Sequence, residues 1–548
     1  MPDIRPPNTT EHNGIAPIHL DEKQRLSNDA ETKTEQYPTK KVLFPILFSI
    51  CMASFLVSLD RTIVGVAVPA ISNEFKAFSD ISWYESAYLL TFATLQLPMG
   101  KIYTFFSSKW IYIFFVFIFE IGSIISAAAP SSVVFIIGRA VSGIGCAGVT
   151  AGSQVLFVDL LPLEKRPKYQ GLLGATFGLA AIAGPLLGGA FASGATWRWC
   201  FWLNLPIGGI ALVILLILLP VKAPPRQMVR GSLIESISQF DPIGTLLLVP
   251  GIILLLLALQ WGPENGSWSS PRVLGTIIPG IFLLVIFAVS QIWIGENGTI
   301  PPRIISQRSI AAASAASLGF GSALIIITFY LPIWYQAIQG LSAVDAGIRL
   351  LAYFLSTVFF VIGSGALVSK LGYYTPLMIL GTAIMIVGCG LLSTVRVNSP
   401  DAEVVGFQVL FGVGMGLALI QPINAGQTVL SREDIPTGLT VINFMNFVGG
   451  TVFVGVCQSI LTHTLTDELR RNVPDLDVAS ILRNGATSLS GSVTPEQRPL
   501  FINAYNAGLV NVFYCAMALS AFAFIASCFL EWRTVKARQS DIEASTTP

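Results

Sequence analysis

The amino-acid sequence predicts an all-α integral membrane protein, and both its composition and its apolar runs support this fold class. Hydrophobic residues make up 53% of the 548 residues and charged residues only 11%, whereas soluble domains carry about 25% charged residues. The mean hydropathy is +0.69. A membrane-spanning helix needs about 20 predominantly apolar residues, and about 14 runs of this kind are present. They are 42–70, 83–100, 110–128, 132–157, 171–192, 200–220, 241–260, 273–294, 310–336, 346–368, 375–394, 404–427, 437–460 and 506–530.

The stretches between these runs suggest how the chain is divided. Residues 1–41 are polar and rich in Pro, Asn, Thr and Glu, a composition typical of a disordered tail. We therefore predict, in order, a cytosolic tail (1–41), a six-helix half (42–220), a cytosolic linker (221–240), two inserted helices (241–294), a second six-helix half (310–530) with an external loop (461–505), and a cytosolic tail (531–548).

An internal repeat of about 265 residues relates the two six-helix halves. Two halves related in this way are typical of transporters, which bind substrate between them near the bilayer midplane, although duplication also occurs in channels. The runs 241–260 and 273–294 have no counterpart in the repeat, so we interpret them as an inserted pair. The matched segments are Gly100 and Lys101 with Gly365 and Lys370, RAVSGIGCAG with FQVLFGVGMG, and Gly188–Gly189 with Gly449–Gly450.

The distribution of Lys and Arg predicts the orientation, because cytosolic loops carry an excess of both residues. With the N-terminus inside, the inner segments include the basic clusters at 165–168 and 533–538, whereas the short outer loops carry few basic residues. Both termini are therefore expected in the cytosol. Asn265 heads a glycosylation sequon in a predicted outer loop, which makes it the candidate glycosylation site.

The stretch 171–209 contains a stripe of small residues that predicts close helix packing. Residues three or four positions apart share one face of a helix, and small residues on such a face let a neighbouring backbone approach closely. Pro185 removes one backbone hydrogen bond and favours a bend. Ordinary membrane-helix packing explains the stripe equally well. The positions on this face are Gly174, Gly178, Ala181, Pro185, Gly188 and Ala192.

Three charged residues inside the predicted spans are candidates for proton coupling, because a buried charge costs roughly 2.5–3.5 kcal/mol and normally has a partner or a function. Asp60 lies slightly outward of the middle of the first span; it either pairs structurally with Arg61 or another helix, or links transport to protons. Arg139 in the fourth span must be hydrogen-bonded within the bundle, where it can stabilise the charged form of a nearby carboxylic acid. For Glu120, at the middle of the third span, a structural role ranks ahead of a functional one.

Uncharged amide side chains are candidates for lining a substrate cavity. Amides inside a membrane more often join helices than bind a ligand. If they do line a cavity, they suit a neutral or weakly polar, aromatic-rich substrate. The candidates are Gln336, Gln421, Asn424, Asn443 and Asn446.

Several function classes are excluded by the absence of their sequence signatures. The chain contains no GxxxxGK[ST] phosphate loop, no HExxH and no GxSxG, so neither an ATPase nor a common hydrolase is indicated. His12, His19 and His463 all lie outside the apolar runs, so we expect no metal site and no cofactor. The net charge of +1 gives no basic footprint for nucleic acid.

Four stretches resemble motifs of the major facilitator superfamily, and more narrowly of its 14-helix drug:proton antiporter branch. LDRTIVGVAVP (59–69) resembles the first-helix motif, and RAVSGIG (139–145) resembles the fourth-helix motif that the family links to proton coupling. GPLLGG (184–189) resembles the antiporter motif of the fifth helix. GKIYTFFSSKW (100–110) matches the gating motif only in part, with Thr104 where an Asp is usual, and this variant resembles the fungal toxin-efflux group.

The resemblance, which covers about residues 42–530, implies the major facilitator fold: two six-helix halves with two inserted helices. It implies a monomeric, proton-coupled efflux antiporter in the plasma membrane or the vacuolar membrane. Its partners would be protons, the lipid bilayer and a small-molecule substrate such as a toxin, drug or secondary metabolite. An importer with the same fold, for example of siderophores, and a sensor without net flux remain open. The gating and antiporter positions implied by the resemblance are Gly100, Lys101, Lys109, Gly184, Pro185, Gly188 and Gly189.

Overall fold

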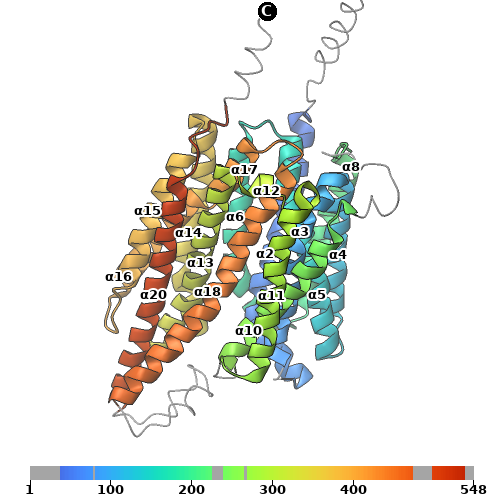
Figure 1. Ribbon diagram of the computed structural model, residues 1–548. Helices are drawn as coiled ribbons and strands as arrows, with labels where there is room; N and C mark the ends of the chain where they lie inside the picture. Colours follow the sequence, from blue (N-terminus) through green and yellow to red (C-terminus); the bar gives the residue numbers. More distant parts are fainter. Residues whose placement is uncertain (1–36, 78–79, 225–237, 265–267, 473–496, 537–548) are drawn as a thin grey trace, which may run out of the picture.

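The computed structural model describes residues 37–77, 80–224, 238–264, 268–472 and 497–536. The regular secondary structure of this described part is helical, apart from one isolated bridge between Tyr373 and Thr534. Thirteen of its helical segments are long and apolar enough to cross a membrane, and α3 (Ile81–Phe105) adds a fourteenth passage of 25 residues whose sequence is more polar. The predicted all-α membrane fold is therefore confirmed (Figure 1).

The first group of helices, which we call the N-terminal bundle, runs from α2 to α8. α2 packs against α6 and α8, while α3 and α4 both pack against α5. Aromatic side chains such as Tyr88, Tyr103 and Phe119 fill the space between these helices. The bundle consists of α2 (Lys40–Phe75), α3, α4 (Ser108–Ala127), α5 (Ser132–Leu160), α6 (Arg166–Gly194), α7 (Trp199–Trp202) and α8 (Asn204–Leu218).

The second group, which we call the C-terminal bundle, runs from α13 to α20. α13 packs against α18 and α20, while α14 and α15 both pack against α16. Its helices are α13 (Arg308–Ala337), α14 (Ala343–Leu371), α15 (Thr375–Leu392), α16 (Asp401–Ala418), α17 (Gln421–Val429), α18 (Ile435–Asn472) and α20 (Arg498–Cys528).

Two further helices, α10 (Pro242–Glu264) and α11 (Pro271–Ile294), pair with each other between the two bundles in the sequence. α10 also contacts α3 and α18, so the pair lies along the seam where the bundles meet (Figure 1). A short connection leads from α11 to the C-terminal bundle through η2 (Gly295–Asn297) and α12 (Pro302–Ile305).

Local sequence explains where several helices begin and end. Ser270 and Ser342 accept hydrogen bonds from backbone N–H groups in the first turns of α11 and α14, as N-cap residues do. α6, α11, α15 and α20 all have Pro in their first two positions, where its missing N–H costs nothing. Gly372 ends α14 with φ +94°, a left-handed conformation that glycine adopts without strain.

Asp241 holds the inserted pair together at the start of α10. Its carboxylate accepts hydrogen bonds from the Gln291 side chain (2.8 Å) and from both the backbone N–H (2.8 Å) and hydroxyl (2.9 Å) of Thr299. It also accepts from the backbone N–H of Gly244 over 2.7 Å. Because Asp241 is only 1% exposed, water cannot take the place of its carboxylate as the acceptor for these donors.

We therefore expect Asp241→Ala to lower the free energy of unfolding by about 3 kcal/mol, since it leaves several buried donors without an acceptor. Thermal unfolding of the purified protein in detergent measures the effect. Asp345→Ala is the matched control, because Asp345 is an exposed aspartate in the first turn of α14. Equal shifts in the two variants would contradict this role for Asp241.

The helices extend beyond several predicted limits. An external loop was expected over 461–505, but α18 continues to Asn472 and α20 begins at Arg498. The ends of these two helices are polar, so they do not belong to an apolar run. The predicted run 404–427 is two helices, which break at Leu419 and Ile420. In the predicted C-terminal tail, the backbone N–H of Val535 donates to Gly372. Residues 1–36, 225–237, 265–267, 473–496 and 537–548, and with them the candidate sequon at Asn265, lie outside the described residues.

The internal repeat has a structural counterpart at two glycines. Gly143 of α5 packs against the backbone oxygen of Tyr88 and the hydroxyl of Thr91 on α3. Gly412 of α16 packs in the same way, against the backbone oxygen of Tyr353 and the hydroxyl of Ser356 on α14. α3 and α5 in the N-terminal bundle therefore correspond to α14 and α16 in the C-terminal bundle.

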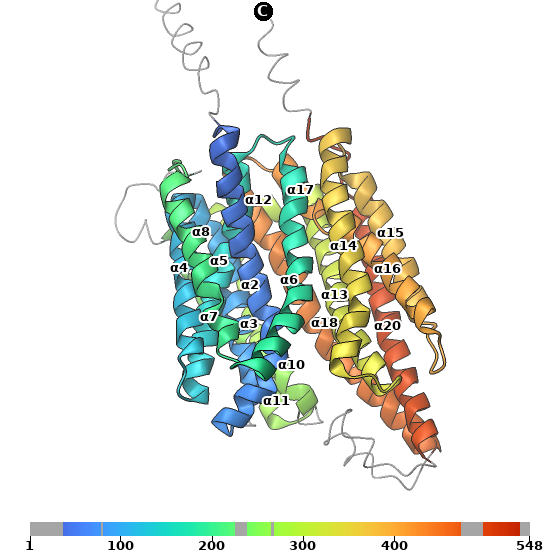
Figure 2. The ribbon, with the colours of Figure 1, turned by 180° about the vertical axis from the view of Figure 1, so that it is seen from behind.

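The two ends of the molecule differ in how closely the bundles approach. The start of α2 and residues 531–536 lie at the same end, which we call the terminal face, and the other end is the opposite face (Figure 1). In both views the bundles meet near the terminal face and diverge toward the opposite face (Figure 2).

Candidate functional site

An ion pair lies inside the N-terminal bundle, where α2, α3 and α5 meet. Arg139 Nη1 donates to Asp60 Oδ2 over 2.5 Å, and neither side chain is exposed (0% for both). Arg139 Nε donates to the backbone oxygen of Tyr84 over 3.0 Å, and the guanidinium lies 4.5 Å from the centre of the Tyr88 ring. Asp60 therefore pairs with α5 rather than with its neighbour Arg61.

Polar side chains extend from this pair to α4 and α8. Asn204 Nδ2 lies 3.5 Å from Asp60 Oδ1 and donates to Ser123 Oγ over 3.0 Å. Glu120, on the same face of α4 as Ser123, is 6% exposed, and neither of its carboxylate oxygens has a hydrogen-bond partner among the described residues. Its Oε1 lies against Gly208 of α8. The three candidates for proton coupling thus share one bundle, but Glu120 forms no hydrogen bond with the pair.

The C-terminal bundle has a neutral residue where the N-terminal bundle has Arg139. Arg139 and Gln408 each precede the corresponding glycines, Gly143 and Gly412, by four residues. Gln408 is buried and donates from Nε2 to the Tyr335 hydroxyl over 2.7 Å. The repeat is therefore broken at this position: the N-terminal bundle has a buried charge here and the C-terminal bundle has an uncharged amide.

Near the terminal face, Gly100 brings α3 against α18. A Cβ at Gly100 would overlap the Thr440 hydroxyl and come within 2.9 Å of Thr437 Cα. Thr104, which stands where the gating motif usually has an Asp, donates to the Gly100 backbone oxygen (2.7 Å), and its hydroxyl lies 3.5 Å from that of Thr437. At this position hydroxyl groups, rather than an ion pair, join the bundles.

The corresponding glycine of the second half, Gly365, brings α14 against α6. A Cβ there would overlap the backbone oxygen of Pro167 and approach Gly171 Cα to 3.1 Å. The backbone N–H of Lys168 donates to Ser369 Oγ over 3.1 Å. α3 with α18 and α14 with α6 therefore form two equivalent close contacts, and together they close the terminal face.

An ion pair reinforces this closure at a different position from the usual motif. Arg432 Nη2 lies 3.4 Å from Asp159 Oδ1 at the end of α5, and Ser108 donates to the other carboxylate oxygen over 2.7 Å. Lys222 also donates to the Asp159 backbone oxygen. Asp159 therefore links the two bundles at this face.

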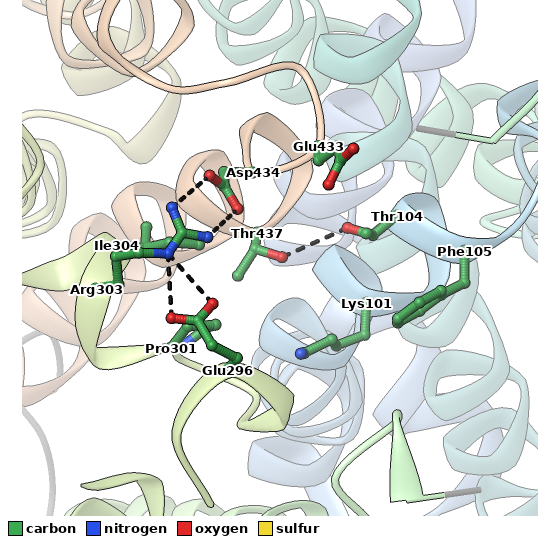
Figure 3. Close-up of a pocket in the computed structure, with 10 residues that line it drawn as sticks. All are labelled: Lys101, Thr104, Phe105, Glu296, Pro301, Arg303, Ile304, Glu433, Asp434 and Thr437. Carbon is green, nitrogen blue, oxygen red and sulfur yellow. Dashed lines mark hydrogen bonds and ion pairs between the residues drawn. The ribbon is translucent and has the colours of Figure 1, made fainter. Parts of the chain in front are cut away.

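A pocket of about 190 Å³ lies beside this closure, between α3, α12 and α18 (Figure 3). Arg303 forms two hydrogen bonds with Asp434 (2.9 and 3.0 Å) and contacts Glu296 at 3.1 Å. Hydrogen bonds to Asp434, and then to Glu296, raise the pKa of the Arg303 guanidinium above its usual range. Lys101 lines the opposite wall. Because the Arg303 side chain is 52% exposed, solvent screens these interactions.

Among the other positions of the implied gating and antiporter motifs, Lys109 and Gly184 make contacts within the N-terminal bundle. Lys109 Nζ donates to the backbone oxygens of Leu216 (2.8 Å) and Leu219 (2.6 Å), at the end of α8 where the helix dipole favours a cation. Gly184 packs against Thr62 of α2, whose hydroxyl donates to the Ala180 backbone oxygen. Gly188 is buried, Gly189 is half-buried and Pro185 is exposed.

The small-residue stripe of α6 therefore packs against two different helices. Gly174 and Gly178 face Val361 and Val358 of α14, whereas Gly184 faces α2. One helix thus joins the two bundles near the terminal face and packs within its own bundle farther along.

The five amide candidates occupy different environments. Gln421 and Asn424 are buried and hydrogen-bonded to each other over 2.9 Å. Gln336 donates to its own helix, and Asn446 donates to Ser317 of α13 over 3.3 Å. Asn443 donates to Gln154 Oε1 on α5 over 2.8 Å, so it is the candidate that joins the two bundles.

Two residues that our sequence reasoning missed lie near this junction. Gln154 accepts the hydrogen bond from Asn443. Arg61, considered only as a partner for Asp60, instead extends toward Phe92 and Phe447. The sequence did mark Arg61 as a charged residue inside an apolar run, but its position next to Asp60 suggested that the two residues pair with each other.

A family model described as Major Facilitator Superfamily matches residues 50–454. The chain is 42% identical over 514 residues to a protein of Neocamarosporium betae named Aspyridones efflux protein, which covers 93% of this chain and 91% of that protein. It is 40% identical over 504 residues to the Rubrofusarin-specific efflux pump aurT of Gibberella zeae, with 92% of each chain covered.

The solved structure of the proton:xylose symporter XylE has a similar fold, with a TM-score of 0.58 over 91% of this chain and 100% of that one. The sequences are 15% identical, so this likeness concerns the fold alone.

Proposed function

Because the chain belongs to the major facilitator superfamily, a family of membrane transporters and not enzymes, we propose that it is a proton-coupled antiporter that exports a toxin, drug or secondary metabolite. Relatives named as efflux proteins, about 40% identical over nine-tenths of the chain, support the direction of transport. The buried Asp60–Arg139 pair is the observation that supports proton coupling.

We place the terminal face in the cytosol and the protein, as a monomer, in the plasma membrane. The excess of Lys and Arg in the segments at that face supports this orientation. The contacts at Gly100 and Gly365 then describe a state closed to the cytosol. In the proposed cycle the two six-helix halves rock about a central site, which alternately opens to the cytosol for substrate and to the outside for protons.

Protonation of Asp60 is the proposed coupling step. A neutral carboxylic acid attracts the Arg139 guanidinium far less than a carboxylate does, so Nη1 would lose its ionic partner. Because Arg139 also holds the Tyr84 backbone on α3 and Asp60 reaches Asn204 on α8, release of the pair would change how α2, α3, α5 and α8 pack. The rearrangement would thereby favour the other state.

The energy available from one proton is sufficient for export. One charge crossing about 100 mV releases roughly 2.3 kcal/mol, and one pH unit adds roughly 1.4 kcal/mol. The sum, about 3.7 kcal/mol, sustains a several-hundred-fold gradient of a neutral substrate, since each 1.4 kcal/mol is a factor of ten.

The test compares small molecules inside cells and in the medium for strains with and without this chain. We expect at least one compound to accumulate inside and fall outside when the chain is absent. Dissipating the proton gradient with a protonophore should cause the same change in cells that contain it. A compound that instead remains in the medium of the deleted strain would indicate import. Unchanged pools, with the protein shown to be present, would favour a sensor.

A further inference from the structure

Arg61 is a permanent cation in the membrane-spanning helix α2, and no residue that the structure describes forms an ion pair with it. It lies on α2 next to Asp60, but Asp60 is engaged by Arg139 at 2.5 Å. Among the described residues, the Arg61 guanidinium forms neither a hydrogen bond nor an ion pair, and its side chain is only half-buried. An unpaired charge at this depth is expensive and normally serves a substrate or an ion.

Two aromatic rings, one from each bundle, flank this cation. The guanidinium carbon lies 5.8 Å from the centre of Phe92 on α3 and 5.9 Å from the centre of Phe447 on α18. The rings meet edge to face, 4.9 Å apart. Arg61 therefore points to the junction between the bundles, where a family member binds its substrate.

The space beside Arg61 is open on one side and closed on the other. Gly65, one turn farther along the same face of α2, has no atom within 4 Å of the position that a Cβ would take. On the side of the terminal face, one turn before Phe447 on α18, Asn443 and Gln154 form hydrogen bonds across the junction. The Asn443–Gln154 hydrogen bonds therefore bar the approach to Arg61 from the terminal face, whereas Gly65 leaves room on the other side.

We propose that Arg61 binds an acidic group of the exported compound while Phe92 and Phe447 contact its ring, so that the substrates are flat ring compounds carrying a carboxylate, phenolate or enolate. This proposal rests on the proposed export function. A guanidinium pairs with a planar anion through parallel hydrogen bonds, and aromatic rings add stacking and apolar contact. Binding would supply the ionic partner that Arg61 lacks among the described residues.

One carboxylate of the protein competes with such a substrate. Glu85 on α3 is half-buried and within electrostatic reach of both Arg61 and Arg139, but it forms an ion pair with neither. A negative charge there weakens the attraction for an anion. Glu85→Gln is therefore expected to tighten the binding of acids and to leave the binding of neutral compounds unchanged.

The experiment measures binding of matched acid and amide probes to the purified full-length protein in lipid nanodiscs by quenching of tryptophan fluorescence. The probes are benzoate and benzamide, 2-naphthoate and 2-naphthamide, and 9-anthroate and its amide. We expect the wild type to bind the larger acids about tenfold more tightly than their amides, the discrimination that a charge-assisted hydrogen bond typically provides.

Three variants assign this preference to the site. Arg61→Gln should remove the preference for acids, and Arg61→Lys should keep most of it. Phe447→Leu should weaken the dependence on ring size for acids and amides alike. Arg272→Gln is the matched control, because Arg272 also lies over an aromatic ring, 3.9 Å from the centre of Trp261, but on the exposed end of α11.

The outcomes separate this proposal from the proposed function. The assignment of Arg61 is wrong if Arg61→Gln keeps the preference for acids. It is also wrong if the wild type binds amides as tightly as acids, or binds none of the probes. If cells still export their own compound in these cases, the export function stands. If the preference for acids is present but no compound is exported, the site is supported and the export function is wrong.

Discussion

Asp60→Asn is expected to abolish pH-driven export and to lower the free energy of unfolding by about 3–5 kcal/mol. The loss of stability follows because Arg139 would keep its charge at 0% exposure without a counter-charge, and a broken buried pair costs this much. The loss of coupling follows because an amide cannot take up the proton. Thermal unfolding of the purified protein and export measured over a pH series test the two effects separately.

A double variant distinguishes coupling from folding. Asp60→Asn with Arg139→Gln removes both charges, so no uncompensated ion stays buried, and we expect stability to return close to that of the wild type. Export should nevertheless remain insensitive to the proton gradient. If a stable single or double variant still exports with the wild-type pH dependence, Asp60 is not the proton carrier.

The helices could be predicted because their signal is local. A run of about 20 apolar residues identifies a span wherever its neighbours lie, and thirteen spans and α3 follow this pattern. The same signal does not identify helical residues that lie outside an apolar run. The stretch THTLTDELRRN at the end of α18 is helical but polar, and therefore looked like loop.

The site was less predictable because pairing depends on which helix faces meet. Asp60 and Arg139 stand out as charges within apolar runs, but nothing in one sequence tells whether Asp60 faces α5 or lies beside Arg61. The structure resolves this choice with one contact of 2.5 Å. The same contact leaves Arg61 without an ionic partner in the part of the chain that the structure describes, and no local pattern reveals this.

We expect a second large effect from a substitution at the closed terminal face, where Gly365 lies at the contact between α14 and α6. Gly365→Leu should hold the two helices apart, since its side chain would overlap the Pro167 backbone oxygen. Overpacking typically costs about 1–3 kcal/mol, enough to shift the balance between the two states by a factor of about 5 to 140. We expect export to fall by a similar factor, while the protein still inserts and folds.

Distances between spin labels on Lys168→Cys and Lys370→Cys, both exposed at the terminal face, measure this opening after the exposed Cys528 is replaced by Ser. The matched control is Gly363→Leu, two residues away on α14, where no atom lies within 4 Å of a Cβ. Gly363→Leu should keep the short distance and the export rate of the wild type, whereas Gly365→Leu should lengthen the distance. If Gly365→Leu keeps the short distance and the export rate of the wild type, closure does not depend on this contact. If the distance lengthens while export persists, closure at α6 and α14 is real but is not required for transport.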